Sequence, residues 1–275
     1  MERKDNQTPQ GEIARILVEF LEVAITSVVS LKGIYPPGAF ERRKYMNVVV
    51  QRARHPQLRE YIHSAVSGLL PFVQKGLVER VAVIFYNTDD IPIERFIFKL
   101  TVNQSFGSNV EESDLEFSLR SFLIKLSVSQ TLTTVLPRDC RWEITAYFRR
   151  LPEVSASKDA EMWIPTDTKQ WQQPPLITPI KSMNSEPLGL QLYLEHPSPS
   201  ELLSGNMTKF GGTGNRMFLA KVGDQQCNQM FCTTHENHLC ESTPRMGMMP
   251  LVGSKGGQNL NWISKELHHL PETEY

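Results

Sequence analysis

The chain has few cysteines and almost no net charge. Only one of its four cysteines, Cys140, lies before position 200, whereas a disulfide framework would need pairs. The formal charge of −1 gives the whole protein no electrostatic attraction to nucleic acid or membrane. No apolar run reaches membrane-spanning length, and Met1–Gln7 lacks the apolar region of a signal peptide. We therefore expect an intracellular protein.

The sequence also lacks the common signatures of catalytic sites. It has no Walker lysine motif, no Gly-x-Ser-x-Gly and no paired-carboxylate signature. The glycine-rich stretch Gly211–Asn215 lacks the preceding strand and following helix that a phosphate-binding loop requires. We expect no catalysis and no cofactor.

The strongest structural signal is a β-hairpin between Arg80 and Leu100. Val81–Phe85 is continuously apolar, which is typical of a strand covered on both faces, and Asn87–Asp90 has turn chemistry. In the second strand, Phe96, Phe98 and Leu100 share one face, while charged residues lie on the other. The first strand should be central, and helices should cover the phenylalanine face.

Helical periodicity predicts three helices around this hairpin. They run from about Gly11 to Lys32, onward from Pro56, and from about Val110 to Ser129. A short extended segment is expected at Met46–Gln51, and the alternation in Cys140–Arg150 predicts a third strand. These elements indicate an α+β domain in which three helices cover a largely antiparallel sheet.

The chain changes character after Leu151. Prolines interrupt any regular element from Leu151 to His196, but aromatic and aliphatic residues recur, so we expect an ordered strap. We place an arm at 1–10, a domain at 11–200 and a mostly disordered extension at 201–275. A short helix is expected only around Trp262–Leu270.

Ordered blocks of residues carry a family resemblance. They are Phe20–Ala24, Tyr35–Phe40, Asn47–Val48, His55–Pro56 with Leu58 and Tyr61–Ile62, Pro92–Phe98, Leu119–Arg120 with Phe122 and Lys125, Pro179–Met183, and Gln191–Glu195. Together they resemble the HORMA-domain accessory (processivity) subunits of DNA polymerase zeta, a mitotic-arrest-deficient-like family with plant members. The resemblance covers about Gly11 to His196. It implies a HORMA fold with the strap at 151–196 as a "safety belt".

The resemblance implies a non-catalytic adaptor in translesion DNA synthesis. Its safety belt would close over a peptide of the polymerase's catalytic subunit, added as a strand beside the sheet. By matching position, Tyr61 and Trp163 would contact that peptide. The alternative is that both aromatic side chains belong to the core.

The resemblance implies further contacts. Leu176, Gln191 and Tyr193 match the surface that receives a Y-family scaffold polymerase, although alternation with Leu190, Leu192 and Leu194 equally places Gln191 and Tyr193 on a solvated face. Arg120 matches a position used in HORMA homo- or heterodimers, and is otherwise an ordinary exposed helix residue. An AAA+ ATPase that remodels the fold is a further implied partner.

Three alternatives stay open in the sequence. One alternative is a spindle-checkpoint or meiotic HORMA signalling protein, which would share the fold. The blocks Tyr35–Phe40 and Pro92–Phe98 instead resemble the polymerase branch. Membership of that branch implies a location in the nucleus and, secondarily, in the cytoplasm. Basic residues from Arg42 to Arg59 could touch phosphates, but no nucleic-acid motif accompanies them, which weighs against direct DNA binding. The spacing of Cys227, Cys232, His235, His238 and Cys240 matches no structural zinc pattern, so we expect no metal.

Overall fold

The computed structural model describes most of the chain up to His196. The described residues are 9–102, 112–137, 139–150, 164–165, 171, 173–185, 188–198 and 218–220. All of them lie in one compact unit that ends at Thr233. In this part of the chain no helix is both long and apolar enough to cross a membrane.

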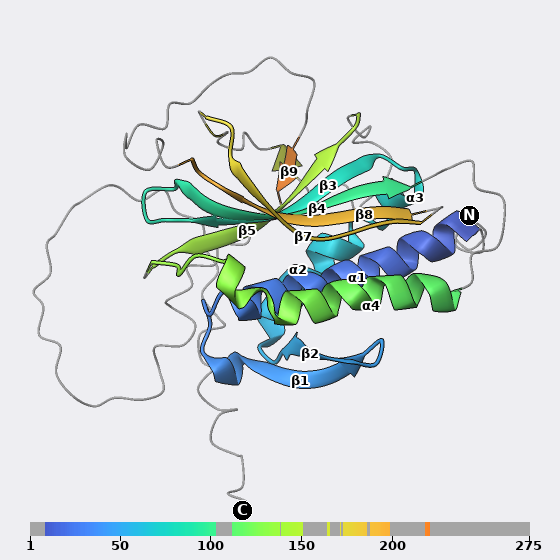
Figure 1. The fold of residues 1–275 in the computed structure, drawn as a ribbon, viewed down its shortest axis with the longest axis horizontal. Coiled ribbons are helices and arrows are strands. Elements are labelled where there is room, and N and C mark those ends of the chain that lie inside the picture. Colours follow the sequence, from blue (N-terminus) through green and yellow to red (C-terminus); the bar gives the residue numbers. More distant parts are fainter. Residues whose placement is uncertain are drawn as a thin grey trace, which may run out of the picture. The chain divides into compact units, whose positions relative to one another are not determined.

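A seven-stranded sheet forms the centre of the fold (Figure 1). Its strands are β3 (Val78–Tyr86), β4 (Pro92–Val102), β5 (Arg141–Phe148), β6 (Ile164–Pro165), β7 (Leu176–Ser185), β8 (Leu188–His196) and β9 (Phe218–Ala220). Their spatial order is β6-β9-β5-β3-β4-β8-β7, and every neighbouring pair is antiparallel. The hairpin prediction is confirmed, because β3 is the middle strand and pairs with β4 and β5.

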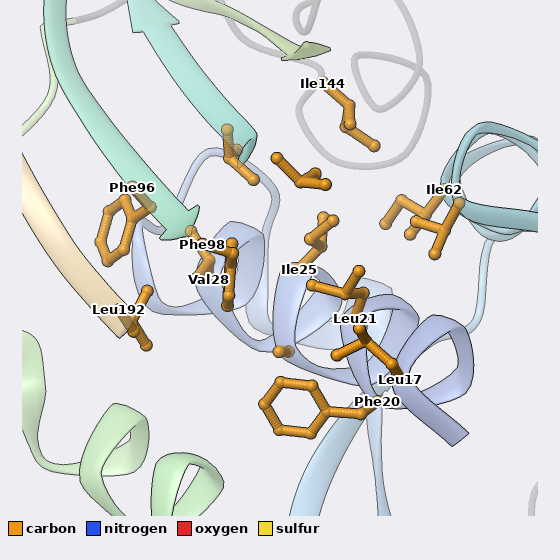
Figure 2. Packing of buried hydrophobic residues seen from close by; sticks show 14 of the residues in the cluster. Leu17, Phe20, Leu21, Ile25, Val28, Ile62, Phe96, Phe98, Ile144 and Leu192 are labelled. Atoms are coloured by element: carbon orange, nitrogen blue, oxygen red, sulfur yellow. The ribbon is translucent and has the colours of Figure 1, made fainter. Parts of the chain in front are cut away.

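Helices α1 (Pro9–Leu31), α2 (Pro56–Ser67), α3 (Leu70–Gln74) and α4 (Glu112–Ser127) cover one face of the sheet (Figure 1). The apolar face of α1 lies at the centre of the core, where Phe20 packs edge-on against Phe122 of α4. Figure 2 shows Leu21, Ile25 and Val28 of this helix among residues from the sheet and α2. The predicted face of β4 is confirmed, because Phe96, Phe98 and Leu100 are buried in this cluster.

A two-stranded hairpin lies beyond the helices (Figure 1). The sequence predicted one extended segment at Met46–Gln51, whereas the chain makes β1 (Phe40–Tyr45) and β2 (Val48–Ala53), preceded by the short helix η2 (Pro37–Ala39). The turn residues Met46 and Asn47 have φ angles of 44° and 59°. This two-residue turn has the twist that hairpins favour.

The strap contains more regular structure than its prolines predicted. Its second half forms the antiparallel pair β7–β8, and β8 pairs with β4 from Leu188 to Glu195. Pro179 is tolerated because β7 is the edge strand and the register shifts between Pro179 and Lys181. The expectation that prolines would prevent regular elements here was therefore wrong.

Candidate functional site

The outer edge of β5 receives a strand from distant parts of the chain. On its inner side β5 pairs with β3, from Val78↔Phe148 to Tyr86↔Arg141. On its outer side Thr145, Ala146 and Tyr147 pair with Ala220, Leu219 and Phe218 of β9. The strap strand β6 then pairs with the far side of β9, through Ile164↔Ala220 and Pro165↔Leu219. A strand thus fits between β5 and the strap.

Tyr61 of α2 lies at one end of this edge. Its hydroxyl accepts a hydrogen bond from the backbone N–H of Ile144, at 3.3 Å, one residue before the stretch paired with β9. Its ring packs edge-on against Trp142 at 5.3 Å, and the side chain is only 9% exposed. Burial raises the pKa of its hydroxyl. Tyr61 is therefore a core residue whose polar end reaches the edge of β5.

The second aromatic residue expected at this edge, Trp163, lies outside the described residues, as does most of the first half of the strap. The adjacent described residues, Ile164 and Pro165, form β6 beside β9. The segment next to Trp163 and the hydroxyl of Tyr61 therefore lie on the same side of β5, where β9 separates β6 from β5.

Trp171 attaches the strap to the other face of the sheet. The guanidinium of Arg95 lies over its ring, 4.4 Å from the centroid, and its indole N–H donates to Glu195 at 3.3 Å. Arg95 and Glu195 are themselves register partners on β4 and β8, with 3.7 Å between their charged groups. The stacking of a guanidinium on an indole is strong when both are shielded from water.

A buried charge network attaches the end of the strap to the domain. Lys32, next to the end of α1, forms an ion pair with Glu94 of β4 and donates to the carbonyl of Thr134. The other oxygen of Glu94 contacts Nε2 of His196, the last residue of β8, at 2.8 Å and accepts from the N–H of Thr134. Burial lowers the pKa of Lys32, and Glu94 partly opposes this shift. Three separate segments thus share one carboxylate.

The β7–β8 pair carries a groove on the face away from the helices. It has a volume of about 630 Å³ and is lined by Lys99, Ile177, Pro179, Ile180, Lys181, Ser182, Gln191, Leu192 and Tyr193. Gln191 is exposed and Tyr193 half-buried, whereas Leu190, Leu192 and Leu194 enter the core as the alternation predicted. Burial raises the pKa of Tyr193. The structure therefore brings Gln191 and Tyr193 together.

Leu176 does not share this groove among the described residues. It is 54% exposed and pairs with His196, whereas its neighbour Ile177 is the one that lines the groove beside Pro179. Side chains alternate along a strand, so a shift by one residue places the side chain on the other face. Ile177 is therefore the apolar residue of β7 beside Gln191 and Tyr193 in this groove, and the role predicted for Leu176 stays a prediction.

Arg120 lies half-buried on α4, on a helix with several exposed apolar side chains. Phe117 is 71% exposed, and Ile124 is exposed as well. Residues three or four apart share a helix face, so Phe117, Arg120 and Ile124 form one strip. Within the described part of the chain, the two apolar side chains of this strip are exposed to solvent and Arg120 is half-buried between them.

The remaining candidates from the sequence are a basic cluster, part of which is exposed on β1, and a cysteine–histidine cluster that lies outside the described residues. Arg42, Arg43 and Lys44 are exposed on β1, where Glu41 pairs with Arg43 at 2.8 Å and lies 3.9 Å from Arg52. The cysteines and histidines from Cys227 to Cys240, and the helix expected around Trp262–Leu270, lie outside the described residues. Within 201–275 the described residues 218–220 form a strand, and the rest of that extension lies outside the described residues.

Comparisons with known proteins agree with this fold. The HORMA domain family model matches residues 14–160. The chain is 68% identical to the Arabidopsis thaliana DNA polymerase zeta processivity subunit, over 74% of this chain and 94% of that protein. It is 32% identical to the human mitotic spindle assembly checkpoint protein MAD2B, over 66% of this chain and 90% of that protein.

Two solved structures share the fold at low identity. A chain of the mitotic checkpoint complex crystal structure superimposes with a TM-score of 0.57 at 15% identity, covering 67% of this chain and 98% of that one. Caenorhabditis elegans HTP-2 bound to the HIM-3 closure motif gives a TM-score of 0.54 at 10% identity, covering 70% and 92%. The chain therefore belongs to the HORMA domain family, in the group that includes the Arabidopsis DNA polymerase zeta processivity subunit.

Proposed function

We propose that this protein is a non-catalytic adaptor subunit of DNA polymerase zeta in translesion synthesis. It holds a peptide of the catalytic subunit as an added strand on the outer edge of β5, beneath the strap. The observation that carries the proposal is the order β6-β9-β5, because it places a strand-sized position between β5 and the strap. The name of the 68% identical relative supports the polymerase as the partner.

Strand addition suits a peptide partner because the backbone supplies the affinity. Each backbone hydrogen bond along β5 compensates a polar group of the peptide, and side chains near the edge provide specificity. Trp163 and Tyr61 are the proposed specificity residues: Trp163 precedes β6, and Tyr61 contacts the amide of Ile144. The strap makes release depend on local opening, because Trp171 and His196 attach it to the domain on both sides of β7.

The groove on β7–β8 is the proposed docking surface for the C-terminal domain of a Y-family scaffold polymerase. Gln191 and Tyr193 lie there beside the apolar Ile177, and Leu176, which the resemblance implies as a contact, is the adjacent residue on β7. The groove is on a different strand pair from the β5 edge, so both partners can bind at once. The protein would then bridge two polymerases, and a nuclear location follows from this role.

Two other partners remain proposals at separate surfaces. The exposed strip of Phe117, Arg120 and Ile124 on α4 suits association with a second HORMA domain. A remodelling ATPase would be needed to open a strap that is attached at several points. The alternative function, spindle-checkpoint signalling, draws support from the name of the 32% identical human relative.

Binding of defined peptides tests the proposal. In titration calorimetry we expect a proline-containing peptide from the catalytic subunit to bind, and peptides from checkpoint partners to bind far more weakly. Trp163→Ala should weaken binding by about 2 kcal/mol, the scale of an aromatic hot spot, or roughly 30-fold. If Trp163→Ala leaves the affinity unchanged and lowers the thermal midpoint, Trp163 is a core residue. Preferential binding of the checkpoint peptides would favour the alternative function.

A further inference from the structure

Residues 218–220 come from the extension beyond the strap, yet they lie inside the sheet. Strand β9 pairs with β5 through three residue pairs and with β6 through two. It is therefore enclosed on both edges, by the domain on one side and by the strap on the other (Figure 1). A segment that merely lay on the surface would pair on neither side.

The chain is long enough to make this connection from within the same molecule. From β8 to β9 the order crosses β4, β3 and β5, four strand spacings of about 4.8 Å, or roughly 19 Å. The residues between His196 and Phe218 can reach roughly 70 Å when extended. The geometry does not require a second copy of the chain.

We propose that residues 218–220 are an internal ligand of the outer edge of β5, which a partner peptide must displace. This inference rests on the proposed function, because it assigns the same edge to both the internal segment and the peptide. The position offers one place between β5 and β6, so the two cannot occupy it together. A tethered segment competes at an effective concentration on the order of millimolar for short flexible tethers.

The internal ligand has two consequences for the clamp. It keeps the outward-facing backbone groups of Ala146 paired when no partner is bound, so the edge of β5 cannot pair with another chain. It also lowers the apparent affinity for any external peptide, in proportion to the fraction of molecules whose edge is free.

Breaking β9 by proline in the full-length chain tests occupancy directly. Leu219 is the middle residue of β9, and a proline there removes an N–H between two paired strands. We expect Leu219→Pro to accelerate hydrogen exchange of the outward-facing Ala146 N–H at least tenfold and leave the thermal midpoint nearly unchanged, whereas the N–H groups of Thr145 and Tyr147 face β3 and should change little. Gln225→Pro, beyond the strand in the same extension, is the matched control and should exchange like the wild type. Equal exchange in wild-type and Leu219→Pro chains would overturn the proposal.

A second measurement uses the segment as a free peptide. A fluorescent peptide of residues 212–226 should bind the Leu219→Pro chain at least tenfold more tightly than the wild type, whose edge is occupied. The same peptide carrying proline at 219 should not bind. Equal binding of the unmodified peptide to both chains, or binding to neither, contradicts the proposal.

The catalytic-subunit peptide separates this inference from the proposed function. It should bind the Leu219→Pro chain several-fold more tightly than wild type or Gln225→Pro. Equal affinity for all three chains would show that the internal segment does not compete. If that peptide binds none of them while the exchange and 212–226 results hold, the proposed partner is wrong and the internal ligand stands.

Discussion

Trp171 shows how a single side chain can control the strap. It contacts Arg95 on β4 and Glu195 on β8, so it joins the irregular part of the strap to a register pair of the sheet. A stacked, shielded cation–aromatic contact contributes about 1–2 kcal/mol, and a hydrogen bond about 1 kcal/mol. These contacts should slow the opening of the strap.

We predict that Trp171→Ala speeds release of a bound catalytic-subunit peptide by roughly 10- to 100-fold, because 1.4 kcal/mol corresponds to a factor of ten. Trp171→Phe keeps a ring over Arg95 and removes only the N–H donor, so it should show a smaller effect. Surface plasmon resonance measures both dissociation rates. Unchanged release from Trp171→Ala would mean that this contact does not retain the strap.

The buried pair of Lys32 and Glu94 gives a prediction about stability. Removing one member leaves an uncompensated buried charge, which typically costs about 3–5 kcal/mol. Lys32→Ala should lose that much in urea unfolding, whereas Lys32→Met with Glu94→Gln should lose less because no charge is left alone. A loss from the double variant equal to that from Lys32→Ala would contradict this explanation.

At the residue scale, the sequence identified side chains but not their surroundings. A peptide contact for Tyr61 was predicted only through the resemblance and stays a prediction, and its packing against Trp142 depends on a contact between distant segments that no local pattern shows. The charge network of Lys32, Glu94 and His196 was missed, because three ordinary polar residues far apart in sequence carry no local pattern. The register likewise places Ile177 and not Leu176 in the groove, which the sequence alone does not show.

At the scale of elements, apolar periodicity predicted the helices and strands that are long enough to show a repeat. Helices α1, α2 and α4 and the hairpin β3–β4 have long apolar repeats, so their type and approximate ends were predicted. The alternation at Leu190–Leu194 indicated part of β8, but β7 was missed because prolines were taken to prevent strands, although an edge strand with a bulge accepts one. Strand β9 has three residues, too few for any repeat, and pairs only with distant segments.

The groove on β7–β8 yields a prediction for the second partner. Ile177→Asp with Tyr193→Ala should abolish binding of the scaffold polymerase's C-terminal domain, because both residues line the groove. Leu176→Asp is the matched control: it lies outside the groove and should retain most binding. Both variants should keep peptide affinity within a few-fold. Titration of the domain by calorimetry gives the result, and loss of binding only in Leu176→Asp would reverse the assignment.

Peptide and scaffold are also expected to assist each other. If closing the strap over a peptide orders the β7–β8 groove, the coupling should be roughly 1–3 kcal/mol, and by reciprocity the scaffold domain should tighten peptide retention equally. Titrating the scaffold domain with and without saturating peptide measures this coupling. Equal affinities would show that the groove is already formed.

At the scale of the whole molecule, the strap contacts the central sheet on both sides of the β5-β3-β4 core. On one side β8 attaches the second half of the strap to β4, and on the other β5 accepts an added strand beside β6. The helices and the hairpin β1–β2 lie on one face, which leaves the other face to Trp171 and the groove. The sheet therefore connects a proposed clamp with a proposed docking surface.

The central claim is that the outer edge of β5 binds the catalytic-subunit peptide as a strand. Hydrogen exchange of the Leu219→Pro chain, with and without saturating peptide, tests it most directly because that variant should begin with a free edge. The account predicts strong new protection of the Ala146 N–H, which faces the outer edge, and of Ile164, and little change on β3, which is already paired on both sides. Tight binding of the peptide without protection of Ala146 would contradict it.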